Sequence, residues 1–384
     1  MDRIKNSFIC FLTGTVILSL VFLSCKQEWY PGIPLEKEKI RIGVIHITDP
    51  FNESSGYSFA HQSGIEEMKQ SVGLKDSQIL YKTNVEDQDT MQIEGRIREL
   101  IAQGANIIIA TSWGYMDICE KLAVEHPLVV FAHATGYKYN ETNFTNFFGK
   151  VYQARYLSGI VAGMQTKTNN IGYVAAWGTD NSEVTGGINA FALGVEKVNP
   201  QAKIFVKVTH SWFDPMGEAA AARALIAAGC DVIAQHCDSA TPLIEAERAG
   251  VWGIGYNTDM SIEAPAAVLT SVLWHWSAYY TVLVNSVIDG TFSTSPWFGS
   301  LNDGIIDLAP LNKNIDFSVP LNETGSFYLL DEERRRIETG EFFVFSGVMK
   351  TNDGGSIGRE GEVFSDEEIR GSINWYYRNV TVIR

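Results

Sequence analysis

Short apolar runs alternate along the chain with stretches of helical periodicity. The runs predict strands at residues 42–47, 106–110, 128–132, 171–175, 202–208, 232–235, 251–255 and 268–273. The stretches between them predict helices, among them residues 64–71, 92–103, 116–125, 153–164, 218–228 and 241–248. Strands that alternate with helices at this spacing indicate parallel sheets covered on both faces. Because there are too many units for one small sheet, we expect an α/β protein with two doubly wound lobes.

Two of the predicted helices end in the same pattern. Residues 100–104 (LIAQG) and 225–229 (LIAAG) each run into a glycine and then into a β-rich segment. Such a glycine is typical of the position just after a helix, where the backbone turns left-handed. The copies lie about 125 residues apart, a period too long for a solenoid. They indicate an internal repeat with one copy in each lobe.

The length of the chain bears on the number of lobes, and its charge bears on the kind of partner. A chain of 384 residues exceeds the size at which a single core usually stops growing, which agrees with two lobes. The formal net charge is −15, and lysines and arginines do not cluster. Binding to nucleic-acid phosphates requires such clusters, so we expect no nucleic-acid partner.

The first 24 residues are predicted to be a signal peptide. Arg3 and Lys5 precede 16 largely apolar residues, too few to cross a bilayer as a helix. The run ends at Ser24-Cys25, which resembles a bacterial lipobox. We therefore expect a mature lipoprotein anchored through Cys25 to the cell membrane, on its extracytoplasmic side, with residues 25–39 as a tether. The alternative is an uncleaved cysteine in an anchor helix.

The other cysteines do not suggest a disulfide framework. Cys10 would leave with the leader, and the remaining Cys119, Cys230 and Cys237 are odd in number and lack CxxC spacing. We expect buried free thiols.

Side chains suited to a planar ligand follow several predicted strands. Parallel strands present such residues at their carboxyl ends, where a doubly wound lobe has its crevice. Aromatic candidates for stacking are Trp113, Trp212, Trp274 and Trp276, and the polar candidates are Asp49, Asp238, Asn257 and Asp259. The tryptophans could instead pack the lobes together, and the acidic residues could cap helices, as Asp238 before SATP would.

Enzyme and metal signatures are weak. The cluster His236-Cys237-Asp238 has ligand-type side chains, but neighbours on a strand point to opposite faces. GIG at 253–255 lacks the third glycine of a dinucleotide fingerprint. We expect no metal, no cofactor and no catalysis; the enzyme alternative is a nucleoside hydrolase that uses Asp49 and Asp259.

A series of motifs in one order carries a family resemblance. It comprises ATSWGYMD (110–117), FAHATGY (131–137), RYLSGIVAG (155–163), INAF (188–191), NP (199–200), SWFDP (211–215), QHCDS (235–239) and IGYNTDM (254–260). From about residue 42 to 310 the chain resembles the basic membrane protein family of ABC-transporter substrate-binding lipoproteins, which includes purine nucleoside receptors. The resemblance implies a type I periplasmic-binding-protein fold, with ligand in the cleft and with permease and ATPase subunits as partners.

The resemblance implies three crossovers between the lobes, and the pattern of strands and helices suggests where they lie. Three crossovers are expected, near residues 148–149, near 271 and near 299–304. The first lobe would take residues 40–149 and 271–300, and the second 150–270 and 301–384. The tail is predicted to add a charged helix at 330–338 and a strand at 342–345 to the second lobe.

The loop TDPFNESSGYSFAH (48–61) combines features of two subgroups of the family. Gly56-Tyr57 and His61 are similar to one, while Phe51 and Asn52 lie in a segment similar to the other. Tyr57, or Phe51, is predicted to face Trp212, so that the ligand stacks between two aromatic rings. The acidic and amide residues would form hydrogen bonds with the polar edges of the ligand. The resemblance favours a purine nucleoside or nucleobase, with riboflavin second; a ligand sensor is the alternative outside transport.

Overall fold

The structure is a computed structural model that describes residues 29–312 and 326–383. The predicted signal peptide and Cys25 lie outside the described residues. Within the described part, no helix combines the length and the apolar character that crossing a membrane requires.

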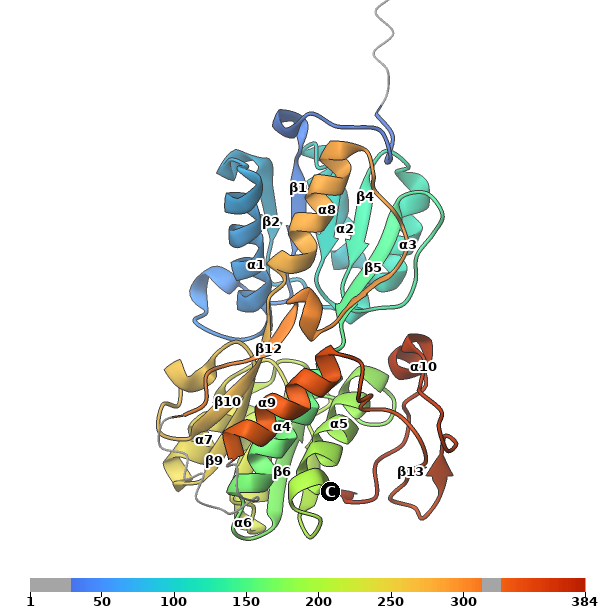
Figure 1. Cartoon of the computed structure of the whole chain (residues 1–384). Coiled ribbons are helices and arrows are strands. Elements are labelled where there is room, and N and C mark those ends of the chain that lie inside the picture. Colours follow the sequence, from blue (N-terminus) through green and yellow to red (C-terminus); the bar gives the residue numbers. More distant parts are fainter. Residues whose placement is uncertain (1–28, 313–325, 384) are drawn as a thin grey trace, which may run out of the picture.

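Two parallel sheets organise the described chain (Figure 1). The first has the order β11-β5-β4-β3-β1-β2, from β1 (Ile42–Ile45), β2 (Ile79–Lys82), β3 (Ile107–Ala110), β4 (Val130–His133), β5 (Phe144–Gly149) and β11 (Trp297–Gly299). The second has the order β12-β10-β9-β8-β6-β7-β15, from β6 (Asn170–Ala175), β7 (Lys203–Val208), β8 (Val232–His236), β9 (Trp252–Asn257), β10 (Val268–Trp274), β12 (Ile306–Leu308) and β15 (Val380–Val382). Among these strands only β12 is antiparallel to its neighbour. The doubly wound α/β prediction is confirmed.

Helices cover both faces of each sheet. The first lobe carries α1 (Tyr57–Val72), α2 (Thr90–Ala102), α3 (Met116–Glu125) and α8 (Ser277–Asp289), and the second α4 (Val151–Gln165), α5 (Ser182–Val198), α6 (Pro215–Ala227), α7 (Thr241–Ala249) and α9 (Ser326–Glu338). In β3, Ile107 and Ile109 join the core under α1 and α8, while Ile108 joins the core under α2 and α3. Alternate residues of one buried strand thus serve opposite helical layers, which is why the strands read as continuous apolar runs.

The internal repeat is visible in atomic detail. Gly104 and Gly229, which follow α2 and α6, both adopt φ +92°. A Cβ on Gly43 of β1 would meet Leu100 and Ile108, and a Cβ on Gly172 of β6 would meet the corresponding Leu225 and Ile233. Each central strand therefore uses a glycine to admit the last leucine of the helix that leads into the next strand.

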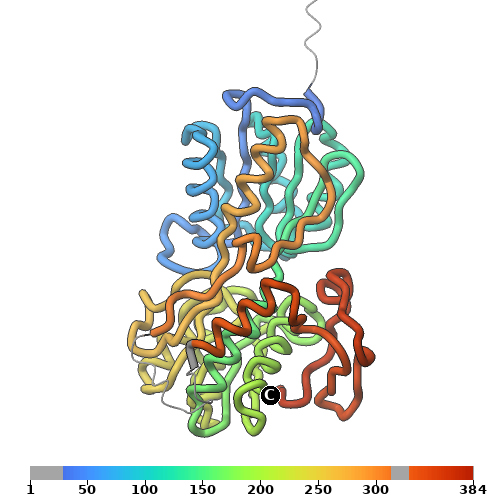
Figure 2. Tube along the Cα trace, viewed as in Figure 1, coloured from blue at the N-terminus to red at the C-terminus, as the bar shows by residue number. Residues whose placement is uncertain are grey.

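The chain passes between the lobes at three places in its described part. It leaves the first sheet after Gly149, returns after Trp274, and leaves again between β11 and β12. The expected change of lobe at residue 271 falls inside β10, which continues to Trp274 in the second sheet. Figure 2 shows the three passages together between the lobes.

The described part of the predicted tether, residues 29–39, lies against the first lobe. Leu35 is buried and its amide donates to the carbonyl of Val287 in α8, at 3.2 Å. The Trp29 indole donates to the carbonyl of Ile33 at 2.7 Å and packs on the core. From Trp29 onwards this segment is therefore anchored.

The tail differs from the prediction after α9. Residues 342–345 form no strand; Val344 and Phe345 are buried, and Phe345 packs on the ring of Tyr152 at 5.3 Å. The sheet is extended by β15 instead. Between them lie a short hairpin, β13 (Met349–Lys350) with β14 (Ser356–Ile357), and α10 (Asp366–Gly371), which reaches towards the first lobe in Figure 1.

Candidate functional site

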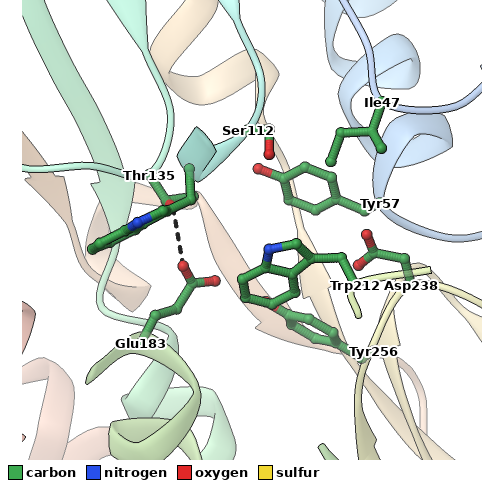
Figure 3. Close-up of a pocket in the computed structure, with 9 residues that line it drawn as sticks. Ile47, Tyr57, Ser112, Thr135, Glu183, Trp212, Asp238 and Tyr256 are labelled. Carbon is green, nitrogen blue, oxygen red and sulfur yellow. Dashed lines mark hydrogen bonds between the residues drawn. The ribbon is translucent and has the colours of Figure 1, made fainter. Parts of the chain in front are cut away.

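A cavity with about 270 Å³ of empty space lies between the lobes, where strands of both sheets end. The first lobe lines it with Ile47, Tyr57, Ser112, Trp113 and Thr135. The second lobe lines it with Glu183, Trp212, Asp238 and Tyr256. Figure 3 shows the rings of Tyr57, Trp212 and Tyr256 around this space. Four large aromatic side chains, two from each lobe, thus meet at one site.

Trp212 is positioned by the cap of the helix that follows it. Asp214 accepts a hydrogen bond from the amide of Gly217 at 3.0 Å, and Pro215 occupies the first turn of α6. Both features are favoured at helix N-termini, so SWFDP fixes where the loop ends and the helix begins. The carbonyl of Trp212 accepts from the amide of Asp238 at 2.8 Å, which joins the two loops of the second lobe.

Tyr57 begins α1 directly after Gly56, which touches the other lobe. Gly56 has φ +97°, and a Cβ there would lie 2.4 Å from the carbonyl oxygen of Asp238. Its amide donates to Thr258 Oγ1 at 3.2 Å. A glycine is required here by backbone conformation and by the approach of the two lobes.

Trp113 lies in a turn after β3 that is held by polar bonds. The Ser112 hydroxyl donates to Asp87 Oδ2 at 2.9 Å, and His133 bonds the Ser112 carbonyl at 2.6 Å. The indole of Trp113 lies 6.0 Å from the ring of Tyr137.

The Asp238 carboxyl faces the cavity rather than capping α7. Asn257 Nδ2 donates to Asp238 Oδ1 at 3.4 Å, whereas α7 has no side-chain cap. Burial, followed by the charge of Glu218, raises the pKa of Asp238 well above its usual value. A protonated carboxyl can donate as well as accept, which suits a heterocycle with both ring nitrogens and carbonyl oxygens.

Glu183 connects the lobes from the first turn of α5. The Thr135 hydroxyl of the first lobe donates to Glu183 Oε2 at 3.0 Å (Figure 3). Burial raises the pKa of Glu183 to about 7, against the opposing effects of Thr135 and Arg155.

A buried cation supports the cavity floor. The Arg155 guanidinium lies 4.0 Å from the Tyr256 ring centre and donates to the Gln235 carbonyl at 2.7 Å. The neighbouring His236 stacks edge-on against Tyr256 at 4.6 Å, and burial lowers its pKa well below the usual value. A neutral His236 beside Arg155 avoids two adjacent buried positive charges.

Several predicted residues lie away from the cavity. Asp49 caps a short turn and accepts from Asn52 at 2.7 Å, so these two satisfy each other. Phe51 is 56% exposed, with its ring against Tyr81. Asp259 caps the turn at residues 260–262. The capping alternative therefore describes Asp49 and Asp259, but not Asp238.

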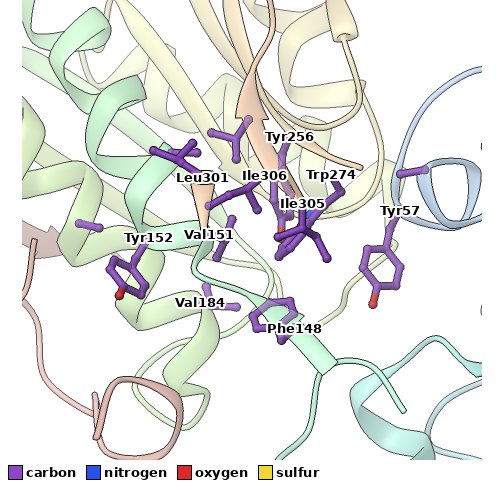
Figure 4. Packing of buried hydrophobic residues seen from close by; sticks show 14 of the residues in the cluster. Tyr57, Phe148, Val151, Tyr152, Val184, Tyr256, Trp274, Leu301, Ile305 and Ile306 are labelled. Carbon is purple, nitrogen blue, oxygen red and sulfur yellow. The ribbon is translucent and has the colours of Figure 1, made fainter. Parts of the chain in front are cut away.

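Trp274 belongs to the crossovers rather than to the cavity wall. It is 4% exposed and stacks on Trp276 at 4.3 Å and on Phe148 at 4.9 Å. Figure 4 shows Trp274 and Phe148 within the apolar core between the lobes. Trp274 is the last residue of β10, one residue beyond the predicted strand, and that position places it between the lobes in a packing role.

Glu183 and Tyr256 line the cavity but are absent from the predicted site. Tyr256 belongs to β9 and lies one residue beyond the predicted strand at 251–255, where the IGYNTDM motif could have indicated it. Glu183 lies on a helix that was not among the predicted elements; its signal is Asn181, whose side chain caps that helix by accepting from the Val184 amide. The buried free thiols Cys119, Cys230 and Cys237 are confirmed.

No group of three or more histidine, cysteine, aspartate or glutamate side chains in the described residues has the geometry of a metal site. What the cavity offers is aromatic surface with hydrogen-bonding groups at its edges.

Comparison with known proteins agrees with this architecture. Residues 40–325 match the Bmp family model, described as ABC transporter substrate-binding protein PnrA-like. A purine-binding protein of Brucella abortus is 34% identical over 350 residues, which cover 91% of this chain and 95% of that protein. A putative ABC transporter glucose-binding protein of Haloferax volcanii is 35% identical over 75% of this chain and 71% of its own length.

Solved structures show the same fold at low sequence identity. A solute-binding protein of an ABC transporter system from Aeropyrum pernix superposes with a TM-score of 0.66 at 15% identity, covering 79% of this chain and 92% of its own. One from Conexibacter woesei gives a TM-score of 0.61 at 20% identity, covering 79% and 97%. The fold is that of type I periplasmic binding proteins, and the chain belongs to the Bmp family of PnrA-like ABC transporter substrate-binding proteins.

Proposed function

We propose that this protein is the lipid-anchored, extracytoplasmic receptor of an ABC importer and that it binds a purine nucleoside or nucleobase between its lobes. Its partners would be the permease and ATPase subunits of that importer. Cys25 would be the lipidated residue that holds it at the membrane.

The observation that carries the ligand class is the aromatic lining. Tyr57 and Trp113 come from one lobe, and Trp212 and Tyr256 from the other. Stacking a base on an aromatic ring contributes roughly 1–3 kcal/mol per base. Because the rings come from both lobes, a planar ligand would gain full contact only when the lobes are closed, which couples binding to closure.

The polar groups favour an uncharged heterocycle. Among the side chains that line this cavity, all of them in the described part of the chain, none is a lysine or arginine, whereas Glu183 and Asp238 are carboxylic acids. Phosphorylated ligands are bound through cationic donors. The two carboxyls instead suit ring nitrogens, carbonyls and hydroxyls. Asn257 is buried behind the cavity lining, where its amide donates to Asp238.

The relatives support this choice unevenly. The Brucella protein is named for purine binding, and the similarity spans nearly its whole length. The Haloferax protein is named for glucose binding. Paired aromatic rings also pack on sugars, but four large rings that meet from both lobes favour a planar ligand. Riboflavin remains the second candidate, because another cavity adjoins the first. A receptor that signals through the same cleft is the alternative outside transport.

Calorimetric titration tests the ligand class directly. The soluble protein lacking its leader and Cys25 is titrated with guanine, guanosine, adenine, adenosine, riboflavin and glucose after removal of any carried ligand by unfolding and refolding. Binding of at least one purine compound, with glucose inactive, is expected. Binding of glucose alone would overturn the proposal.

A further inference from the structure

A second cavity, with about 370 Å³ of empty space, adjoins the first and is called the second chamber below. Trp113, Thr135 and Glu183 line both cavities, so the two meet at these side chains. The rest of the second chamber is mainly aromatic and apolar, with Phe148, Tyr152 and Phe298 on its walls. Figure 4 shows the first two of these side chains.

Two glycines on α5 line the second chamber. Gly186 and Gly187 follow Glu183 by three and four residues, so helical spacing puts all three on one face. A Cβ on Gly187 would lie 2.8 Å from His236 Nδ1, so a side chain is excluded there. Gly186 has room for a side chain, which would lie at the wall of the chamber.

Arg370 of α10 closes the far end. Its guanidinium donates to the Gly136 carbonyl and to Asn146 Oδ1 in the first lobe. Arg370 also lines an open groove on the outer surface, so it is the wall between chamber and solvent. The segment is fixed to the second lobe, where the Ser182 hydroxyl donates to the Arg370 carbonyl at 2.6 Å.

The contacts of Arg370 indicate the chemistry it could offer. The Gly136 carbonyl and Asn146 Oδ1 that accept from it are neutral oxygens, and its Nε–H is buried without a partner among the described residues. The guanidinium therefore retains a donor. Glu183 at the other end of the chamber disfavours an anionic group there, because its carboxylate would repel one.

We propose that α10, which lies beyond the family match at residues 40–325, completes the ligand site, and that the second chamber receives a neutral, oxygen-bearing part of the ligand attached to the stacked ring. This rests on the proposed function and extends it. Two sources share the chemistry: the ribose of a nucleoside, or an additional ring carrying carbonyl oxygens in a larger heterocycle.

Filling the chamber tests the proposal. A Cβ on Gly186 would lie 3.5 Å from Ile373 Cδ1, an ordinary van der Waals contact, so the backbone accommodates a side chain. Gly186→Leu is compared with Gly95→Leu, a glycine-to-leucine change in α2 at a site where nothing lies within 4 Å. Each variant and the parent are titrated calorimetrically with guanine, guanosine, lumichrome and riboflavin.

If the chamber holds ribose, Gly186→Leu weakens the binding of guanosine by about tenfold or more and leaves the affinity for guanine unchanged. If it holds an additional ring, lumichrome and riboflavin both lose affinity and guanosine does not. Gly95→Leu leaves all affinities unchanged. Arg370→Gln provides a second variant and is expected to weaken the same compounds.

Two results would contradict a ligand site in the second chamber while leaving the proposed function intact. The first is an equal loss of affinity for guanine and guanosine with no loss for the flavins. The second is that neither Gly186→Leu nor Arg370→Gln changes any affinity. If the parent protein binds none of the four compounds, adenine and adenosine are titrated in their place, and failure to bind these as well would overturn the proposed function, and this inference with it.

Discussion

Thr135 Oγ1 of the first lobe lies 3.0 Å from Glu183 Oε2 of the second, so a hydroxyl on one side of the cleft donates to a carboxyl on the other. The bond crosses the border between the two cavities. Ser54 and Glu263 make a second bond of this kind at 2.5 Å, from the opening loop to the second lobe. These contacts describe a closed arrangement, and opening must break them.

Stability should depend on pH through Glu183. Burial raises its pKa from 4.5 to about 7, so in this window the closed, folded protein holds a proton that a solvated carboxyl has released. The contribution to stability is therefore lost as the pH rises from about 4.5 to 7, by up to roughly 3 kcal/mol in the free energy of unfolding. Thermal unfolding across this window should show it.

Glu183→Gln is the matched comparison, since glutamine retains a hydrogen-bonding oxygen for Thr135 but does not titrate. Histidines with lowered pKa, such as His46 at about 4, contribute the opposite slope equally in both proteins. The Tm of the parent should fall relative to Glu183→Gln as the pH rises. Parallel curves of Tm against pH for the two proteins would show that Glu183 is solvated and that its pKa is not raised.

Replacing Trp212 with alanine should weaken ligand binding by roughly ten- to a hundredfold, the equivalent of 1–3 kcal/mol. The bond from the Asp238 amide to the Trp212 carbonyl involves only main chain, so the loop itself should persist. Trp212→Phe should recover much of the affinity because it restores a stacking face. Calorimetric affinities that are equal for parent and alanine variant would exclude Trp212 from the site.

Gly56→Ala should impair closure. The substitution places a Cβ at φ +97° and 2.4 Å from the Asp238 carbonyl oxygen across the cleft. Gly32→Ala is the control, with φ +91° and nothing within 4 Å. Both should lose stability through backbone strain, but only Gly56→Ala should bind weakly and fail to show the smaller radius of gyration expected on ligand addition in X-ray scattering. Equal compaction in both variants would contradict a closing contact at Gly56.

Cys25→Ala should release the protein from the membrane fraction. The reason is the leader that ends at Ser24-Cys25, a sequence feature outside the described residues. Detergent phase partitioning of cells that express each form measures it. An alanine variant that still partitions with the detergent would rule out lipidation at this cysteine.

Strands were predicted from the sequence more reliably where they are uniformly apolar than where they contain polar residues. Residues 107–110 read as a strand because both of their faces are covered. β5 (FTNFFG) mixes polar and aromatic residues and was not among the predicted strands, although every residue in it is buried. The polar ones are satisfied by hydrogen bonds: Asn146 Nδ2 donates to the Lys138 carbonyl, and the Thr145 hydroxyl donates to the distant Ser295 carbonyl. Hydrogen bonds of this kind are not visible in periodicity.

The site was predictable where a residue type and a strand end coincided, as at Trp212 and Asp238. The site was not predictable where a polar residue at a strand end caps a neighbouring turn instead of facing the cavity. Asp49 and Asp238 both follow a strand, but Asp49 has an amide two residues away to cap, while Asp238 has Asn257 across the sheet. Tertiary packing decides which hydrogen-bond partner each aspartate has. It also decides that Glu183 of α5 lies at the cavity.

The most direct test of the proposed ligand is to identify what the protein carries when it is purified. The protein is denatured, and the released small molecules are examined by ultraviolet–visible spectroscopy and mass spectrometry. The account predicts a purine, with absorption near 260 nm and no visible colour, and with the mass of a nucleoside or nucleobase. A sugar or an amino acid as the bound molecule would contradict the aromatic site proposed here.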